Sequence, residues 1–162
     1  MKICGVVGWK NSGKTFFAQK LISYFVEKKL IVSSIKHAHH DFDIDKPNTD
    51  SYLHRKAGSQ QIIVSSSKRW AKITELKQSK EKTLYELINE LNISDIVIVE
   101  GFKNEKHSKI EIINDSSDSS TYLFPYLKNI IGIVSNTKIN TSIKQFQKSE
   151  IDNIANYILK NT

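Results

Sequence analysis

The amino-acid sequence predicts an α/β fold of three layers, with a mostly parallel sheet that an antiparallel hairpin extends. Short apolar runs typical of buried strands occur at residues 2–7, 30–36, 95–100 and 130–135. Segments with apolar residues at helical spacing separate most of these runs, and this alternation favours parallel strands joined by helices. The chain is long enough to bury one substantial core, so we expect a single domain over residues 1–162.

The first strand and the first helix, expected over residues 14–28, are joined by a glycine-rich turn. Residues 8–15 fit the phosphate-binding pattern G-x-x-x-x-G-K-[ST]. Glycines let consecutive N–H groups curl towards phosphate oxygens, and the helix adds its positive end. Lys14 can reach the β- and γ-phosphates, while the Thr15 hydroxyl can bind Mg²⁺. A chance match in a glycine turn is the alternative, but both flanks are those that a P-loop requires.

We therefore expect a P-loop NTPase-like fold. The predicted phosphate-binding residues are Gly8, Lys10, Asn11, Ser12, Gly13, Lys14, Thr15 and Phe16.

The predicted strand at residues 30–36 runs into a stretch rich in histidine and aspartate. Its candidate ligands are His37, His39, His40, Asp41, Asp43 and Asp45. Both residue types bind metals, yet the stretch has neither paired cysteines nor the zinc-helix spacing, so a polar loop is the plainer alternative to a zinc site. Because the stretch leaves the carboxyl end of its strand, we favour a loop that faces the nucleotide or its substrate. Asp41 or Asp43 would then reach Mg²⁺ through water.

A short helix over residues 52–57 is expected next, capped by Asp50 or Ser51. Arg55 on this helix either points at phosphates or faces solvent, and the sequence leaves both open. Residues 60–65 and 70–75 are strand-like, and their short polar link indicates an antiparallel hairpin. We expect this hairpin to extend one edge of the parallel sheet.

A second nucleotide motif follows the helix expected over residues 84–91. Residues 96–99 are four consecutive β-branched residues typical of a strand covered on both faces, and Glu100 follows them directly. In P-loop proteins an acid at the end of such a strand holds the Mg²⁺. We therefore predict Glu100 and Thr15 as the magnesium-side pair, in preference to a simple strand-end carboxylate.

Two further strands, at residues 109–113 and 130–135, and a closing helix at residues 148–159 complete the expected fold. The polar residues 114–120 between the strands form a loop. Nucleotide bases are often read at the end of the last strand, where Asn136-Thr137-Lys138 stands. This tripeptide does not match the guanine-reading pattern Asn-Lys-x-Asp, so the residues alone leave the base undetermined.

The composition of the chain restricts the kinds of partner and the cellular compartment that we expect for it. Its formal charge of +7 suggests an anionic partner, but the lysines are spread from end to end, so nucleotide phosphates explain it better than nucleic acid. No apolar run is long enough to span a membrane, and we expect no signal peptide. The lone cysteine, Cys4, fits a buried strand position. Together these features predict a cytoplasmic protein.

Three stretches taken together resemble the MobB family, the adapter proteins of molybdopterin-guanine dinucleotide biosynthesis. They are residues 8–15, the His37–Asp45 stretch with Asp50-Ser51 and Ala57-Gly58, and Val99-Glu100-Gly101-Phe102-Lys103. The resemblance implies a P-loop fold with a mixed sheet, a homodimer, and binding of GTP with Mg²⁺. The chain departs from the family where Asn48 follows Pro47 in place of a glycine, and where residues 135–137 lack a common aspartate.

The resemblance implies a GTP-binding adapter that assists the molybdopterin guanylyltransferase and hydrolyses GTP slowly at most, with molybdopterin itself as a further candidate ligand. A slow rate is reasonable, because we find no evident glutamine to orient the attacking water and no assured arginine finger. A small-molecule kinase that uses the His/Asp stretch as its substrate site, with Asp43 as base, is the alternative. A basic nucleic-acid-binding module is the third possibility, but it lacks a recognisable reader motif.

Overall fold

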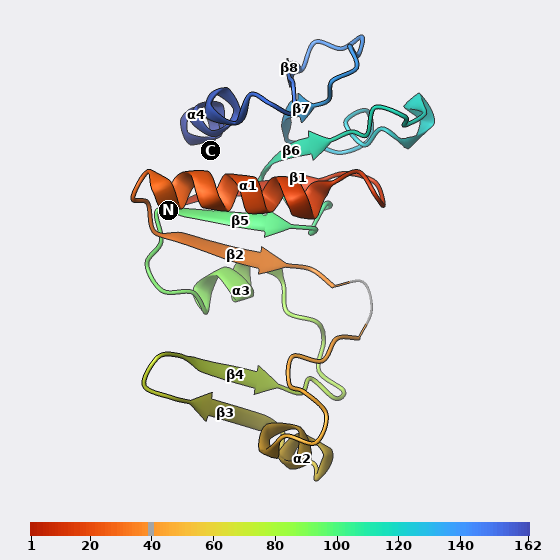
Figure 1. Ribbon diagram of the computed structural model, residues 1–162. Helices are drawn as coiled ribbons and strands as arrows, with labels where there is room; N and C mark the ends of the chain where they lie inside the picture. Colours follow the sequence, from red (N-terminus) through yellow and green to blue (C-terminus); the bar gives the residue numbers. More distant parts are fainter. Residues whose placement is uncertain (39–40) are drawn as a thin grey trace. The chain divides into compact units, whose positions relative to one another are not determined.

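The computed structural model describes every residue except His39 and His40, and it divides into two compact units. The first unit comprises Met1–His37 and Leu84–Thr162, and the second comprises Ala38–Thr83. The elements of the first unit are β1 (Lys2–Val7), α1 (Lys14–Glu27), β2 (Val32–Lys36), α3 (Leu84–Asn89), β5 (Ile96–Glu100), β6 (Ser108–Ile112), η1 (Ser119–Thr121), β7 (Ile130–Val134), β8 (Lys144–Phe146) and α4 (Ile151–Asn161) (Figure 1). Those of the second unit are α2 (Asp50–Lys56), β3 (Gln61–Ser65) and β4 (Trp70–Thr74).

The first unit is built on a six-stranded sheet in the order β2-β5-β1-β6-β7-β8. Every pair of neighbouring strands in this sheet is parallel. Parallel strands end at the same edge, so the segments that follow β1, β2, β5, β6, β7 and β8 all emerge together. That edge is where open α/β sheets bind their ligands.

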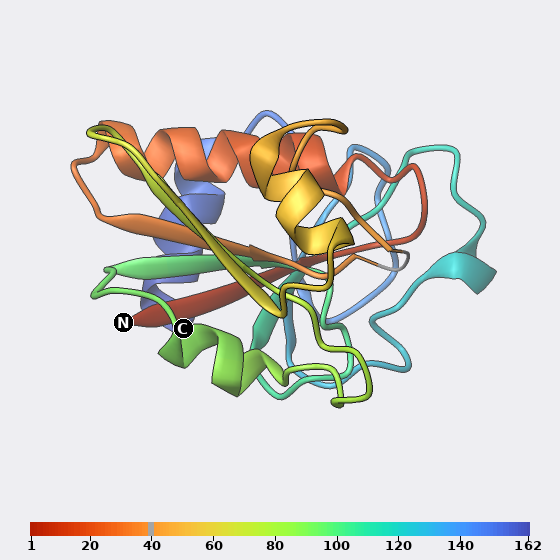
Figure 2. The same ribbon diagram turned by 90° about the horizontal axis from the view of Figure 1, so that it is seen from below.

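Helices cover both faces of the sheet, as the continuous apolar strands predict. Ile96 and Ile98 of β5 pack in one cluster with residues of α1 and α4, including Leu21 and Ile158. Val97 and Val99, which point to the opposite face, pack with Leu84 at the start of α3. Figure 2 shows α1 and α3 on opposite sides of the strands. The predicted α/β fold with its mostly parallel sheet and three layers is confirmed.

Two charged residues of β6 are buried, although the sequence shows only a simple alternation there. Lys109 and Glu111 are exposed to 0% and 1%. The Lys109 ammonium group donates to the carbonyl groups of Glu105 and His107, and the Glu111 carboxylate accepts from the N–H groups of Leu123 and Phe124 at 2.7 Å. Burial is tolerated because backbone groups satisfy both charges. The same burial lowers the pKa of Lys109 and raises the pKa of Glu111.

The hairpin is present, but its predicted place at the edge of the parallel sheet is wrong. Strands β3 and β4 pair antiparallel, with Gln61 opposite Thr74 and Ser65 opposite Trp70, and they form a two-stranded sheet of their own. Within the described residues, β2 pairs only with β5. A short polar link fixes which two strands pair with each other, but it carries no information about which larger sheet they join.

Two further details differ from the prediction. Strand β8 was not predicted, because it has only three residues and no recognisable alternation of apolar and polar side chains. Helix α4 begins at Ile151 rather than near Lys148, since the preceding residues follow β8 instead.

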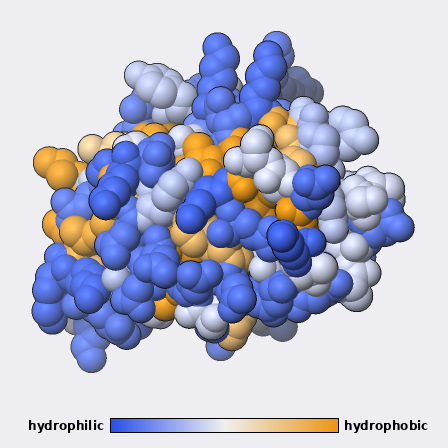
Figure 3. Space-filling model, turned by 90° about the horizontal axis from the view of Figure 1, so that it is seen from above, coloured by the Kyte–Doolittle hydropathy of each residue, from blue (hydrophilic) through white to orange (hydrophobic). Residues whose placement is uncertain are grey.

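No helix in the described part of the chain has both the length and the apolarity to cross a membrane. The face shown in Figure 3 is largely hydrophilic, with hydrophobic residues in interrupted groups.

Candidate nucleotide-binding site

The loop between β1 and α1 is curled over the start of the helix. The Ser12 N–H donates to the Trp9 carbonyl at 3.2 Å, and the Lys14 ammonium group donates to the same carbonyl at 3.0 Å. Helix α1 starts directly after Gly13, and its first intrahelical bond runs from the Phe17 N–H to the Gly13 carbonyl at 2.9 Å. The N–H groups in the first turn of α1, before Phe17, have no acceptor within the helix. They form a donor-rich concave surface suited to phosphate.

A buried hydroxyl inside this loop fits a bound phosphate, and a glycine beside it keeps the loop closely packed. The Ser12 hydroxyl is buried and has no hydrogen-bond partner among the described residues. Gly8 lies so close to the Ser12 hydroxyl and the Ile112 carbonyl that an added Cβ would collide with both. An unsatisfied buried hydroxyl is costly, and a phosphate oxygen would satisfy it. Lys10 and Asn11 are exposed on the outer part of the loop, and Phe16 is 62% exposed on the first turn of α1.

The predicted magnesium-side pair is brought together from residues far apart in the sequence. The Thr15 hydroxyl donates to the Glu100 carboxylate at 2.8 Å, and the Glu100 side chain is 16% exposed. The Lys36 ammonium group lies 3.7 Å from the same carboxylate oxygen. Oxygen ligands of this kind are those that Mg²⁺ takes, together with water and phosphate. The pair therefore fits a magnesium ion beside a phosphate held by the loop.

The carboxyl ends of β2 and β5 hold the first histidine of the His/Asp stretch next to this pair. The His37 N–H donates to the Glu100 carbonyl at 2.8 Å, and the His37 ring stacks on Phe102 with 4.5 Å between the ring centroids. Gly101 has φ 95°, and a Cβ there would lie 2.7 Å from the His37 Cβ. Glycine is therefore required at position 101 for this close approach.

The rest of the stretch belongs to the second unit. His39 and His40 lie outside the described residues, and Asp41 is exposed. Arg55 pairs with the carboxylates of Asp43 and Asp45, each at 2.8 Å, and lies 3.7 Å from Glu75. The hydrogen bond from Arg55 is the main reason that the pKa of Asp45 is lowered. Among the described residues, no group of three or more histidine, cysteine or acidic side chains could hold a metal ion. A role for this stretch towards the nucleotide stays a prediction.

A polar cluster that the sequence did not reveal lies at the ends of β6, β7 and β8. The Asp115 carboxylate accepts from the Asn136 N–H at 3.1 Å, from the Asn136 side-chain amide at 2.9 Å, and from the Lys148 ammonium group at 3.1 Å. These bonds lower the pKa of Asp115, the Asn136 side chain contributing most. Asn136 was considered for base reading from sequence, but Asp115 stands in a serine-rich loop and Lys148 follows the unpredicted strand β8. The position of Asp115 after a predicted strand was the only signal that the sequence offered.

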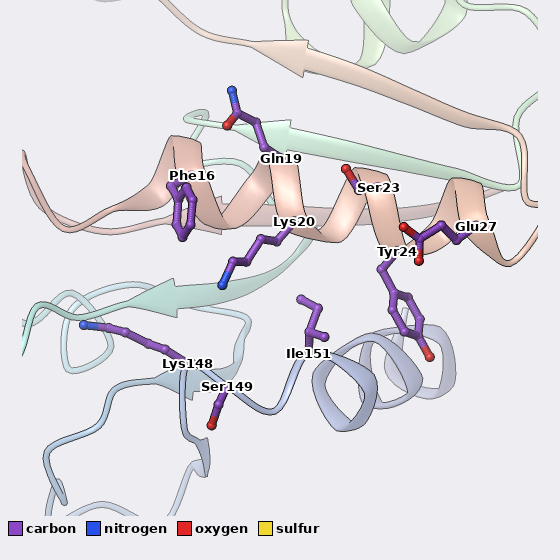
Figure 4. A pocket seen from close by; sticks show the side chains of 9 residues that line it. All are labelled: Phe16, Gln19, Lys20, Ser23, Tyr24, Glu27, Lys148, Ser149 and Ile151. Atoms are coloured by element: carbon purple, nitrogen blue, oxygen red, sulfur yellow. The ribbon is translucent and has the colours of Figure 1, made fainter.

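An open groove of about 360 Å³ runs along α1 from its first turn (Figure 4). One wall is formed by α1 and the other by the segment that enters α4. Its lining residues are Phe16, Gln19, Lys20, Ser23, Tyr24, Glu27, Lys148, Ser149 and Ile151. Figure 4 shows Phe16 and Lys148 at the same end of the groove. The groove therefore connects the first turn after the phosphate loop with the polar cluster.

Comparison with known proteins points to one family. The family model described as MobB, molybdopterin guanine dinucleotide synthesis protein B, matches residues 3–136. A curated relative from Escherichia coli K12, named molybdopterin-guanine dinucleotide biosynthesis adapter protein, is 33% identical over 154 residues, which cover 94% of this chain and 88% of the relative. A relative of the same name from Haemophilus influenzae is 37% identical over 108 residues, covering 67% of this chain and 61% of the relative.

Solved structures support the fold independently. The crystal structure of Bacillus subtilis MobB aligns with a TM-score of 0.76 at 22% identity, covering 97% of this chain and 98% of that one. A crystal structure of molybdopterin-guanine biosynthesis protein B aligns with a TM-score of 0.73 at 21% identity, covering 98% and 97%. At this level of identity the alignments establish the shared fold.

Proposed function

This chain belongs to the MobB family, with a matching family model over residues 3–136, and we propose that it is an adapter protein that binds GTP with Mg²⁺. The adapter role belongs to molybdopterin guanine dinucleotide biosynthesis, as the names of its relatives state. In this role the chain assists the guanylyltransferase that joins a guanine nucleotide to molybdopterin.

The hydrogen bond between Thr15 and Glu100 is the observation that carries the proposal. It places a hydroxyl from the phosphate loop 2.8 Å from the acid that ends the neighbouring strand β5. When bound, Mg²⁺ would neutralise charge on the β- and γ-phosphates. Gly13, Lys14 and the first-turn N–H groups would bind those phosphates, while Thr15 and Glu100 would hold the metal side. The buried Ser12 hydroxyl adds a donor that lacks a partner in the described chain.

The expected hydrolysis of GTP is slow, and this suits a binding role. Catalysis of phosphoryl transfer depends on a group that positions the attacking water and on positive charge supplied at the transition state, which alone can be worth about 10³-fold or more. Arg55, one of the two arginines of the chain, is held by the carboxylates of Asp43 and Asp45 and so is not free to supply that charge. We therefore propose that this chain mainly binds GTP and that the partner enzyme carries out the reaction that consumes it.

The partners proposed for the adapter are a MobA-type guanylyltransferase and a second copy of this chain, with molybdopterin as a further ligand. The proposed working compartment is the cytoplasm. Family membership supports the proposal of these partners, and the positive charge of +7 favours anionic ligands in general.

A reconstituted guanylyl-transfer assay tests the adapter role. We expect addition of the chain to raise the rate at which a MobA-type transferase forms the dinucleotide from molybdopterin and Mg²⁺·GTP. The Lys14→Ala variant should lose this stimulation, because it lacks the ammonium group that reaches the phosphates. Lys28→Ala, which removes an exposed lysine just beyond α1, should stimulate like the unaltered chain. An unchanged rate with the unaltered chain, or full stimulation by Lys14→Ala, contradicts the proposal.

A further inference from the structure

The cluster of Asp115, Asn136 and Lys148 lies at the edge of the sheet that also carries the phosphate loop. The loop follows β1, and the three residues follow β6, β7 and β8, which are the next three strands in order. Since all these pairs are parallel, their following segments emerge at one edge. Glu100, the last residue of β5, and His37, which follows β2, lie on the other side of β1. The magnesium side and the cluster therefore flank the phosphate loop.

The residue that precedes Asp115 contacts the phosphate loop. The side-chain amide of Asn114, the residue before Asp115, donates to the Asn11 carbonyl at 3.4 Å. Lys148 lines the same groove as Phe16, the residue after Thr15, and Figure 4 shows the two at one end of it. A nucleotide with its phosphates on residues 13–15 thus has this cluster within reach of its remaining part.

The hydrogen bonds inside the cluster decide which groups it can offer. The Asn136 side-chain oxygen already accepts the Lys148 N–H at 3.2 Å, and its amide donates one hydrogen to Asp115 at 2.9 Å. The Lys148 ammonium group donates one hydrogen to Asp115 at 3.1 Å and carries two more. The hydrogens that remain free on the Asn136 side-chain amide and on the Lys148 ammonium group are N–H donors, and Asp115 holds both groups in place.

We infer that this cluster is the base-recognition site of the bound nucleotide and that it selects guanine through its O6 and N7 acceptors. Lysine donors match the O6 and N7 of guanine, whereas adenine presents a donor amino group in place of O6. Lys148 and Asn136 contact the base, and Asp115 is a positioning residue. This inference rests on the proposed nucleotide binding. It assigns guanine selection to a pattern other than Asn-Lys-x-Asp.

Calorimetric titration of the full chain with GTP, ITP, ATP and inorganic tripolyphosphate, each with Mg²⁺, tests the inference. ITP keeps O6 and N7 but lacks the 2-amino group, so it should bind about as tightly as GTP, and ATP should bind more weakly. Lys148→Met and Asn136→Ala should each lower the preference for GTP over ATP by about tenfold. Asp115→Asn should lower the same preference. Tripolyphosphate affinity should be unchanged in all three variants, which also shows that they are folded. Lys148→Arg should retain the preference.

Lys160→Met is the matched control, because it removes an exposed lysine from the last turn of α4. It should keep the preference for GTP. The inference is overturned if the preference survives in the three cluster variants, or if ITP binds as weakly as ATP. In both cases the proposed function stands. If the unaltered chain binds neither GTP nor tripolyphosphate, the proposed function fails and the inference fails with it.

Discussion

At the scale of single residues, the proposed nucleotide site depends on a pair that is distant in sequence. Thr15 and Glu100 are separated by 85 positions, yet their side chains are 2.8 Å apart. The chemistry of each was predictable separately, because a hydroxyl after the loop lysine and an acid after a buried strand have recognised roles. Their contact could be inferred only once both strands were assigned to one parallel sheet.

Replacing Glu100 with glutamine should separate phosphate binding from magnesium binding. Glutamine keeps an oxygen that can accept the Thr15 hydrogen bond, but it loses the charge that attracts Mg²⁺. We expect affinity for Mg²⁺ in the presence of GTP to fall about 10- to 100-fold, as is typical for partners that support a metal. GTP affinity in EDTA should be unchanged. Glu27→Gln, at an exposed position of α1, is the control. Equal magnesium dependence in Glu100→Gln would remove Glu100 from the site.

We predict that the stability of the protein depends on pH through His107. Burial, and then the charge of Lys109, lower the pKa of His107 to about 4, from an ordinary value of 6.5. The unfolded chain therefore takes up a proton near pH 6.5, while the folded chain stays neutral until about pH 4. Stability is lost as pH falls through this window. After allowance for partial exposure, we expect a loss of about 1 kcal/mol between pH 7 and pH 5.

Urea unfolding at the two pH values measures this loss. The His107→Phe variant keeps a ring over Gly5 but cannot be protonated, so its stability should fall by less than that of the unaltered chain between pH 7 and pH 5. His54→Gln, at an exposed position, should fall like the unaltered chain. The same pH dependence in His107→Phe and the unaltered chain would rule out this origin of acid sensitivity.

At the scale of elements, the packing of α1 holds the phosphate loop in place. Leu21 is 0% exposed and lies in one cluster with Ile154 and Ile158 of α4. Removing its buried methyl groups should lower the free energy of unfolding by about 2–5 kcal/mol. Chemical denaturation of Leu21→Ala measures this, with Val26→Ala as the control on the same helix because Val26 is 53% exposed. A loss below about 1 kcal/mol for Leu21→Ala would show that α1 is not anchored there.

Elements with strong periodicity or a motif were predicted closely from the sequence. The strands and helix around the phosphate loop match the prediction within two residues, because apolar spacing and glycine chemistry agree there. Strand β8 was missed because three residues are too few to show alternation. The hairpin was found, but its separate sheet was not foreseen, since its sequence specifies only its own pairing.

At the scale of the whole molecule, the parallel order of the strands unites the candidate site. The ends of β5, β1, β6, β7 and β8 bring the proposed magnesium-side acid, the predicted phosphate loop and the proposed base-recognition cluster to one edge. Asp115 and Lys148 could not be recognised in advance, because their relation to Asn136 exists only through strand order. The contribution of residues 38–83 to nucleotide binding remains a prediction, carried by Asp41, Asp43 and Arg55.

Nucleotide binding by the phosphate loop is the central claim, and calorimetry on the unaltered chain and its Lys14→Ala variant tests it most directly. We expect Mg²⁺·GTP to bind the unaltered chain at one site, more tightly than Mg²⁺·GDP or Mg²⁺·ATP. Lys14→Ala should lose at least about tenfold in affinity for Mg²⁺·GTP, equivalent to about 1.4 kcal/mol. Absence of binding to the unaltered chain, or equal binding to Lys14→Ala, would contradict the account.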